Sequence, residues 1–453
     1  MTPALRTIPL EVNLIELHQA YPQRYPHLLQ STAHGRYDIL FAFPGESLML
    51  DSTGSLYSPD NVTAQSNDFL ECFDRWWDQA GNRQEPHADL PFTGGWFVYL
   101  GYELAGQIEP RLLLPPPATE LPVAMATRFT CAIVFDHRDG TTAIVSEPDQ
   151  AARVQQIETD IAALSAAAPD AVPVPEITAV DEAPAQGYLD AIARIHTYIR
   201  EGDVFQVNLS RRWDIHYRDA VDRVALYRNL GIHNPAPFSG LISCPEAAII
   251  SSSPERLVSV RGRHVETRPI AGTRPRSAAA AADRAHSREL LAHPKEQAEH
   301  IMLIDLERND LGRICVPGSI AVNELMVLES YAHVHHIVSN VRGQLRDSIT
   351  PGEVIRAVFP GGTITGCPKV RCMEIIAELE QEARGAYTGS AGYINLDGSM
   401  DLNILIRSMT CSGNRVQFRA GAGIVADSVA AAELAETRAK ARGLLHALGV
   451  ADA

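Results

Sequence analysis

Residues 421–440 read GAGIVADSVAAAELAETRAK, so a glycine-rich segment runs directly into a helix-forming one. The small residues at its start are typical of backbone that passes close to another group. In the helical part, Glu433, Glu436 and Lys440 are three and four positions apart and would therefore share one face. The segment predicts a strand followed by a helix that presents two carboxylates and an ammonium group side by side.

A second helix-forming segment, KEQAEH at residues 295–300, carries Glu296 and Glu299 with the same spacing. If the four carboxylates converge, they repel one another in a partly buried site unless a cation lies between them. Mg²⁺ suits such a site, because it takes one or two protein carboxylates and keeps water and substrate oxygens as its other ligands. We expect one glutamate from each helix to bind Mg²⁺ and the other two to hold metal-bound water. The alternative is that both pairs lie on solvated helix faces, where this spacing is common.

The composition is that of a globular protein. Of its 453 residues, 45% are hydrophobic and 21% charged, and no run approaches the roughly 18 apolar residues of a membrane span. The first residues lack the basic start and apolar centre of a signal peptide, so we expect a cytoplasmic protein without membrane contact. The formal net charge of −16 argues against a nucleic-acid partner. The seven cysteines include no CxxC pair and are expected to be reduced thiols.

The order of strand and helix signals predicts an α+β fold. Residues 1–165 form an N-terminal region with hairpin signals, such as the Asp-Gly turn at 139–140. Residues 166–187 are rich in alanine and proline and are expected to be a linker. Residues 188–450 combine hairpins with amphipathic helices, the first of which should end at Gly202. Because the strands come in hairpins with helices set between them, a doubly wound sheet is disfavoured.

The glycine-rich loop FPGGTITGCPK at residues 359–369 resembles a phosphate-binding loop, but Cys367 stands where a Walker motif needs lysine. A nucleoside triphosphate site is therefore excluded, whereas the helix N-terminus after the loop suits a carboxylate. HVHH at residues 333–336 would alternate its side chains along a strand. We expect one functional histidine and two structural ones there rather than a metal-binding trio.

Two charged residues lie among strand-forming segments. Glu255 follows a proline at the head of a strand, where a glutamate is either a surface residue or one placed for chemistry. Arg407 lies within LNILIRSM, and a charge in such a strand usually has a partner. That partner is either a substrate carboxylate or a structural acid, and the sequence favours neither.

Nine long motifs together resemble the chorismate-utilising enzymes, the family of anthranilate, aminodeoxychorismate, isochorismate and salicylate synthases. The resemblance covers residues 185–445 strongly and the N-terminal region more loosely. It implies an anthranilate-synthase-like fold, in which two packed antiparallel β-sheets are flanked by helices. The motifs are GDVFQVNLS, SSSPERL, RPIAGTRPR, EHIMLIDLERNDLGR, HVHHIVS, FPGGTITGCPKVRCMEII, GAYTGSAGY, DLNILIR and AGAGIVADS.

The resemblance implies a role for each matched residue. Glu299 and Glu436 resemble the family's Mg²⁺ ligands, with Glu296 and Glu433 in support. Glu255 resembles the general acid that protonates the departing 4-hydroxyl of chorismate, a dianion whose loss of hydroxide needs both a proton and charge stabilisation. The residues that resemble the substrate site are Thr273, Tyr387, Arg407, Gly421, Gly423, Lys440 and Asn208, with Thr363 and His336 at the ring.

The family divides by its nucleophile. Members that add water carry a lysine base where this chain has Gln206, so isochorismate and salicylate formation are disfavoured. Ammonia needs no such base. No GxCxGHQ-like glutaminase motif occurs in the sequence, so the ammonia is expected from a separate glutamine amidotransferase subunit.

Two ammonia-using branches remain. Asn208, Gly362 and His335 resemble aminodeoxychorismate synthase component I, which implies Mg²⁺-dependent amination of chorismate at C4 to 4-amino-4-deoxychorismate, for 4-aminobenzoate and folate. Ala271 departs from that branch, in which many members have a lysine that attacks the ring, and matches anthranilate synthase component I. Anthranilate synthase, which aminates C2 and eliminates pyruvate for tryptophan synthesis, stays the alternative. A catalytically inactive binding subunit is disfavoured, because the catalytic set is intact.

LLQS at residues 28–31 resembles the region where relatives hold tryptophan as inhibitor or structural ligand. The predicted pocket consists of Leu29, Ser31, Pro237 and Phe238. Gln30 replaces the glutamate of regulated anthranilate synthases, which weakens the case for feedback. The alternative is that residues 28–31 are simply the buried end of a strand and bind no ligand.

Overall fold

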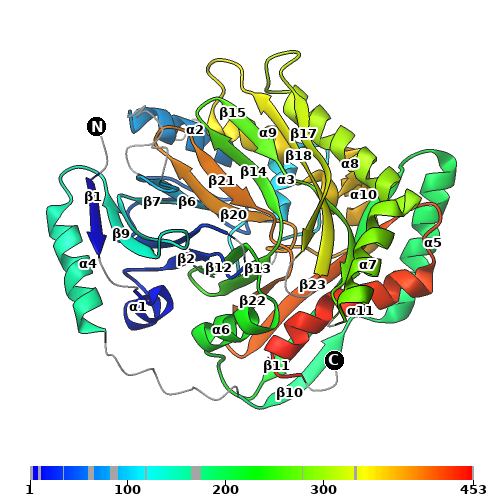
Figure 1. Ribbon diagram of the computed structural model, residues 1–453, viewed down its shortest axis with the longest axis horizontal. Coiled ribbons are helices and arrows are strands. Elements are labelled where there is room, and N and C mark those ends of the chain that lie inside the picture. Colours follow the sequence, from blue (N-terminus) through cyan, green and yellow to red (C-terminus); the bar gives the residue numbers. More distant parts are fainter. Residues whose placement is uncertain are drawn as a thin grey trace.

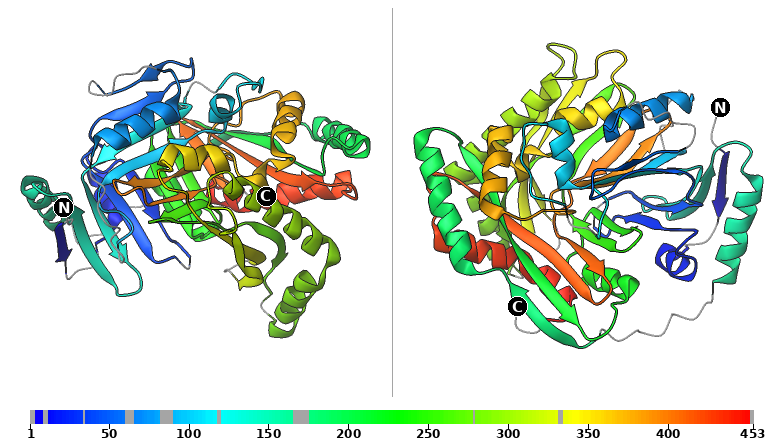
Figure 2. Two further views of the ribbon diagram at one scale, coloured as in Figure 1. Left: turned by 90° about the horizontal axis from the view of Figure 1, so that it is seen from above. Right: turned by 180° about the vertical axis from the view of Figure 1, so that it is seen from behind.

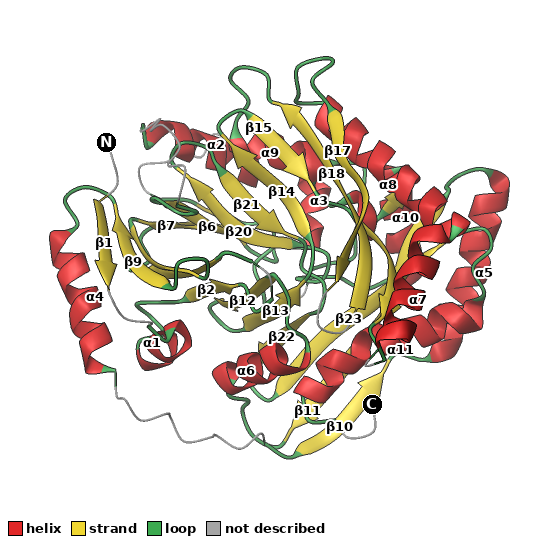
Figure 3. Ribbon diagram, in the orientation of Figure 1, coloured by secondary structure: helices red, strands yellow, loops and turns green. Residues whose placement is uncertain are grey.

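Two large antiparallel β-sheets with helices around them make up the protein, as the computed structural model shows (Figure 1). The structure describes residues 4–8, 12–33, 35–59, 66–81, 90–117, 120–164, 175–277, 279–330 and 334–450. The helices lie on the outside of the two sheets (Figure 3). The predicted α+β fold with two packed antiparallel sheets is confirmed.

The first sheet combines strands from near both ends of the chain. In spatial order its strands are β1 (Ala4–Ile8), β9 (Thr141–Ser146), β8 (Cys131–Asp136), β3 (Tyr37–Ala42), β2 (His27–Gln30), β12 (Phe238–Ser243), β13 (Ala248–Ser253), β22 (Ser408–Ser412), β23 (Arg415–Ile424), β11 (Gln206–Tyr217) and β10 (Ile177–Glu182). The short β19 (Gly366–Cys367) also pairs with β11.

The second sheet combines the two regions in the same way. In spatial order its strands are β16 (Ile270–Pro275), β18 (Val334–Gln344), β15 (His264–Thr267), β14 (Arg256–Arg261), β21 (Met400–Asn403), β20 (Ser390–Asn395), β6 (Gly95–Leu100), β7 (Ala124–Phe129), β4 (Ser47–Leu50) and β5 (Leu56–Tyr57). β17 (Ala321–Ser330) pairs with β18 beside this path.

The helices connect and cover these strands. They are α1 (Leu14–Ala20), α2 (Phe69–Gln79), α3 (Ala105–Ile108), α4 (Ala151–Ala163), α5 (Ala185–Glu201), α6 (Arg223–His233), α7 (Ala280–Ala292), α8 (Pro294–Gly312), α9 (Pro351–Val358), α10 (Lys369–Glu380) and α11 (Ala430–Ala447), with the short 3₁₀ turns η1 (Tyr102–Leu104) and η2 (Gly362–Ile364). Among the described residues, no helix has both the length and the apolar character needed to cross a bilayer.

The two regions expected from the sequence share both sheets. In the first sheet, β2 pairs with β12 and places Leu28 opposite Leu241. Residues 177–182, assigned to the linker from the sequence, form β10 along the edge strand β11. Their alanine- and proline-rich surroundings gave no sign of this strand, because its partner is a distant segment. Residues 165–174 lie outside the described residues, and the division into two regions stays a prediction.

A core of aromatic and aliphatic side chains joins the two sheets. Phe41 of β3 lies 5.4 Å from Phe97 of β6 and 5.3 Å from Phe129 of β7, measured between ring centroids. Such edge-on and tilted contacts add to the stabilisation from apolar burial. Further cores fill the space under α2, α8 and α9 on the second sheet, and under α1, α6 and α11 on the first. The strands therefore form a rigid base for the loops at their ends.

Local sequence signals explain several element boundaries. α5 ends at Gly202, whose φ of +82° is the left-handed conformation that glycine adopts without strain. The predicted turn at 139–140 joins β8 to β9. In Figure 2, the dark blue strand β1 beside the N-terminus lies at one end of the molecule, and the red helix α11 extends toward the other side. All seven cysteines are free, as expected.

Candidate active site

Strands β11 and β23 bring the predicted substrate residues together. Gly423 lies opposite Asn208 in their register. A Cβ added to Gly421 would lie 2.8 Å from the Tyr387 hydroxyl and 3.0 Å from Asn208 Oδ1, and one added to Gly423 would overlap the Gln206 amide. The two glycines thus provide the space in which three polar side chains approach the strand.

Four buried side-chain atoms of the predicted set have no hydrogen-bond partner in the described structure. They are Gln206 Oε1, Asn208 Oδ1, Glu255 Oε1 and Thr363 Oγ1. Buried polar atoms in folded proteins are nearly always bonded. The Asn208 amide nitrogen lies 3.5 Å from the Thr363 carbonyl oxygen, which links β11 to the η2 turn. This cluster of unsatisfied atoms indicates a site that a polar ligand completes.

Glu255 is a buried acid whose carboxyl group stays protonated up to near-neutral pH. It lies in the turn between β13 and β14 and is 4% exposed. Burial raises the pKa of Glu255 to about 7, while the Thr363 hydroxyl, the Ile270 N–H and the charge of Lys440 offset only part of this effect. Thr363 is near enough to influence this pKa, yet it forms no well-directed hydrogen bond. A carboxyl with a pKa near the working pH is suited to general acid catalysis.

The described histidines of HVHH occupy different environments. His336 is buried, and burial lowers its pKa to about 4 although a hydrogen bond to the Gly272 backbone opposes the shift. It is therefore a neutral polar group at pH 7. His335 contacts the Ser330 hydroxyl at 2.8 Å and Asp283 at 3.1 Å, which is a structural arrangement. His333 lies outside the described residues.

Arg407 and Lys440 form the positive side of the site. Arg407 is half-buried, and its Nη1 donates to the carbonyl oxygen of Lys440. Among the described residues, no carboxylate lies within ion-pair distance of Arg407. Lys440 Nζ contacts Glu436 at 2.6 Å and the Gly421 carbonyl oxygen at 3.0 Å. A substrate carboxylate as the partner of Arg407 stays a prediction.

The four glutamates of the predicted Mg²⁺ site lie on α8 and α11. Glu296 pairs with Arg274 at 3.1 Å, and Glu436 pairs with Lys440. Within the described ranges, no group of three or more His, Cys, Asp or Glu side chains lies close enough together to hold an ion directly. The oxygens of the four glutamates are the donors that Mg²⁺ prefers, but Glu296 and Glu436 would have to leave their cations to bind it. A site with one glutamate from each helix stays a prediction.

β16 places two further predicted residues beside His336. Thr273 lies opposite His336 in the β16–β18 register, and its side chain is outside the described part of the chain. Ala271 is buried and offers no nucleophile. Between them, Gly272 has a φ of +71°, and a Cβ there would lie 2.8 Å from Glu296 Oε2. The strand therefore connects the histidine to the acidic face of α8.

Sequence reasoning missed two buried charge clusters behind the site. Burial and the nearby Asp310 raise the pKa of Glu307 on α8 to about 8, and Lys369 Nζ lies 2.5 Å from Asp310 Oδ2. Glu380 and Arg384 form an ion pair at 2.7 Å with both side chains 1% exposed. Their sequence signal is a charge within a partly apolar segment, and that signal does not identify the partner.

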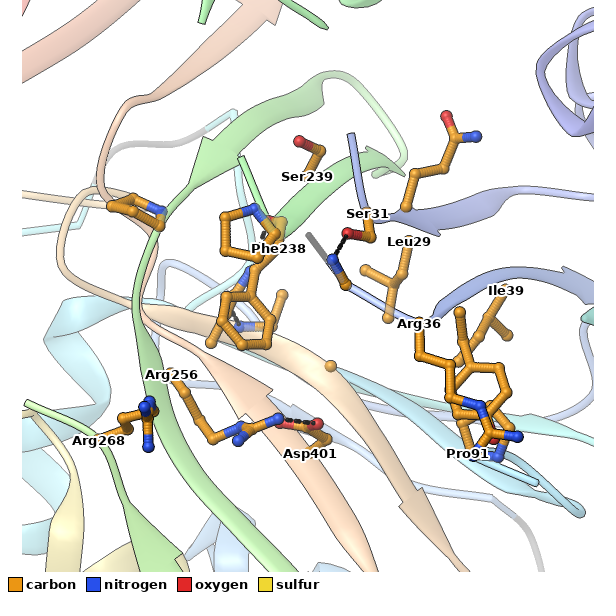
Figure 4. Close-up of a pocket in the computed structure, with 18 of the residues that line it drawn as sticks. Leu29, Ser31, Arg36, Ile39, Pro91, Phe238, Ser239, Arg256, Arg268 and Asp401 are labelled. Atoms are coloured by element: carbon orange, nitrogen blue, oxygen red, sulfur yellow. Dashed lines mark hydrogen bonds and ion pairs between the residues drawn. The ribbon is translucent and has the colours of Figure 1, made fainter. Parts of the chain in front are cut away.

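A separate cavity of about 590 Å³ contains the predicted tryptophan-pocket residues (Figure 4). Leu29, Ser31, Pro237 and Phe238 all line it. Four arginines that the sequence did not indicate also line it: Arg36, Arg256, Arg261 and Arg268. Figure 4 shows Arg256 directed at Asp401, to which it donates at 2.8 and 2.9 Å. Tryptophan as the ligand stays a prediction.

Residues 28–446 match the family model of the chorismate binding enzymes. The chain belongs to this family. This chorismate binding enzyme is 38% identical to aminodeoxychorismate synthase component 1 of Bacillus subtilis over 462 residues, which cover 99% of this chain and 98% of the relative. It is 40% identical to anthranilate synthase component 1 of Thermus thermophilus over 374 residues, which cover 82% and 80%.

A solved structure supports the same assignment. Anthranilate synthase component I from Streptococcus pneumoniae shares the fold with a TM-score of 0.80 at 32% identity, over 91% of this chain and 92% of that one. The protein is thus a chorismate-utilising enzyme with an anthranilate-synthase component I fold. Relatives named aminodeoxychorismate synthase component 1 and relatives named anthranilate synthase component 1 are similarly close.

Proposed function

We propose that this enzyme aminates chorismate at C4 to give 4-amino-4-deoxychorismate, for 4-aminobenzoate and folate synthesis, in the cytoplasm. The observation that carries the proposal is the cluster of unsatisfied buried atoms beside the near-neutral acid Glu255. Gln206 stands where addition of water would need a base, and a neutral amide is not one. Relatives named aminodeoxychorismate synthase component 1 match almost the full length. Their designation as component 1 supports a separate glutamine amidotransferase as the ammonia source.

Chorismate is a dianion, so its binding requires local positive charge in an acidic protein. Arg407 and Lys440 supply that charge, and the Tyr387 hydroxyl and the backbone at Gly421 and Gly423 surround the same space. Mg²⁺, held by Glu299 and Glu436 with Glu296 and Glu433 beside them, would add positive charge at the ring carboxylate.

Glu255 gives its proton to the C4 hydroxyl, the C4–O bond breaks, and water leaves. Ammonia forms the new C4–N bond and releases a proton, which returns to the Glu255 carboxylate. The neutral imidazole of His336 and the hydroxyl of Thr363 orient the ring without adding charge. Ala271 cannot attack the ring. Ammonia therefore either adds to C4 directly or displaces an external nucleophile that has first added to the ring.

Product analysis tests the proposal. The purified chain is incubated with chorismate, Mg²⁺ and ammonium at mildly alkaline pH, and half of each sample is treated with aminodeoxychorismate lyase before chromatography. We expect 4-aminobenzoate only in the treated half. Anthranilate in both halves would overturn 4-amination.

Anthranilate synthase is the second candidate, because Ala271 stands in place of the lysine of many 4-aminating relatives. The matched variant is Ala271→Lys. If the wild-type chain makes anthranilate and Ala271→Lys shifts the product toward 4-aminodeoxychorismate, position 271 decides the branch.

A further inference from the structure

A guanidinium group lies directly behind the substrate-facing segments. Arg384, in the loop that follows α10, is buried, and its side chain is 1% exposed. Its Nη2 donates to the carbonyl oxygen of Asn208 at 2.7 Å, and its Nη1 donates to that of Ile364 at 3.1 Å. Asn208 carries one of the unsatisfied side-chain atoms, and Ile364 directly follows Thr363, which carries another. One rigid group therefore connects the two backbone segments that present these atoms.

The same guanidinium contacts the segment that carries Tyr387. Its Nη1 lies 3.3 Å from Thr388 Oγ1, and its Cζ lies 5.6 Å from the centroid of the Tyr387 ring. The loop backbone is also fixed, because the N–H groups of Arg384 and Gly385 donate to the carboxylate of Glu103 at 2.7 and 3.0 Å. Arg384 thus touches three separate segments of the site.

Glu380 is the anchor that orients Arg384. Its Oε1 accepts from Arg384 Nη2 at 2.7 Å, and its Oε2 accepts from Nε at 3.0 Å. The carboxylate also accepts from the Ser210 N–H and hydroxyl, each at 2.8 Å. Burial alone would raise the pKa of Glu380, but the guanidinium groups of Arg384 and Arg419 hold it below its usual value. The anchor is therefore ionised, and a two-point ion pair fixes the plane of the guanidinium.

Arg419 shares the anchor without reaching the site. It is 5% exposed, donates to Glu380 Oε2 at 3.0 Å, and donates to the Ser210 hydroxyl at 3.0 Å. Its Nη1 contacts Glu382 at 3.2 Å. The described hydrogen bonds of Arg419 include none to Asn208, Ile364 or Tyr387, and Arg419 acts on Tyr387 only through its charge, which opposes the rise in the pKa of that phenol. The two arginines have similar burial and the same ion-pair partner, so the chain itself supplies a matched control.

We propose that Arg384 is a positioning residue, which sets the spacing between Asn208, Thr363 and Tyr387 by bonding the backbone behind them. The proposal rests on the proposed function only in taking these three residues as the substrate cradle. A planar guanidinium can bind two carbonyl oxygens and a carboxylate together, whereas a lysine ammonium is a point charge with three donors on a flexible stem. Lysine at 384 would keep the charge, but it could not hold both carbonyl oxygens in one plane.

The experiment compares Arg384→Lys with Arg419→Lys. Thermal unfolding, chorismate affinity without ammonia, and kcat and KM for the wild-type product are measured for both. We expect similar losses of thermal stability, because each variant loses a guanidinium contact to Glu380. We expect kcat/KM to fall about 100-fold in Arg384→Lys, as misplacement by about 1 Å can cause, and less than about 5-fold in Arg419→Lys. Equal activity losses in the two variants would overturn the proposal.

A second variant covers the case in which Arg384→Lys does not fold. Arg384→Met combined with Glu380→Gln removes both charges of the pair, so neither of them is left buried alone. Arg419, the other partner of Glu380, keeps its ion pair with Glu382. A folded double variant with wild-type kcat/KM would equally overturn the proposal. Product identity in the wild-type enzyme is determined separately. If the product is anthranilate, the proposed function fails and the comparison of the two arginines still applies.

Discussion

Replacing Glu255 by glutamine should stabilise the protein at alkaline pH while removing most of its activity. Burial raises the pKa of Glu255 from 4.5 to about 7, and the side chain has little access to solvent. Each pKa unit corresponds to about 1.4 kcal/mol, so a shift of this size corresponds to about 3 kcal/mol. Glutamine has a similar shape and cannot ionise, so the variant does not carry this cost.

The direction of this pH dependence of stability follows from proton binding. Between pH 4.5 and 7, the folded protein keeps the Glu255 proton while the unfolded chain has released it, so wild-type stability falls as pH rises through this window. The free energy of unfolding of Glu255→Gln should therefore equal that of the wild type near pH 4.5. The variant should exceed the wild type by about 3 kcal/mol above pH 7. The wild-type protein is therefore less stable above pH 7 than the variant, because it keeps a buried acid that its activity requires.

Urea denaturation of both proteins at pH 5, 6, 7 and 8 measures the difference. Glu246→Gln, which changes an exposed carboxylate, is the control and should show no pH-dependent gain. The rate with ammonia, corrected for the free-base concentration at each pH, should drop by about 10²- to 10⁴-fold in Glu255→Gln. In the wild type this corrected rate should decline above pH 7, where Glu255 loses its proton. A stability difference that is constant across pH, or a variant with near wild-type activity, would refute the reasoning.

Three further results are expected. Glu436→Gln should raise the Mg²⁺ concentration for half-maximal rate by about 10- to 100-fold, and an unchanged Mg²⁺ titration would remove Glu436 from the metal site. Gly423→Ala should lower kcat/KM by about 10- to 100-fold, because its Cβ would overlap the Gln206 amide. Its circular dichroism spectrum should stay that of the wild type. Normal activity of this variant would mean that Gln206 does not border the substrate. L-tryptophan at about 100 times its Kd should stabilise the wild-type protein by about 2.7 kcal/mol but not Phe238→Ala, and no thermal shift in the wild type would exclude tryptophan from the cavity.

The sequence by itself determined the features that depend on neighbouring residues. The end of α5 at Gly202 and the hairpin between β8 and β9 were predictable because capping and turn formation involve only a few consecutive positions. The motif residues were identifiable for a related reason, since each motif is a continuous string. The position of Gln206 beside Gly423 and of Asn208 beside Gly421 is consistent with that identification.

The tertiary structure decided the features that depend on distant segments. β10 could not be recognised within the predicted linker, because among the described strands it pairs with β11, a distant segment. Arg384 gave no signal because its Asn208 acceptor is 176 positions away. The pKa of Glu255 likewise follows from burial by surrounding segments rather than from its own motif. Strand pairing, burial and ion-pair choice are set by which surfaces exclude water together, and no local pattern contains that information.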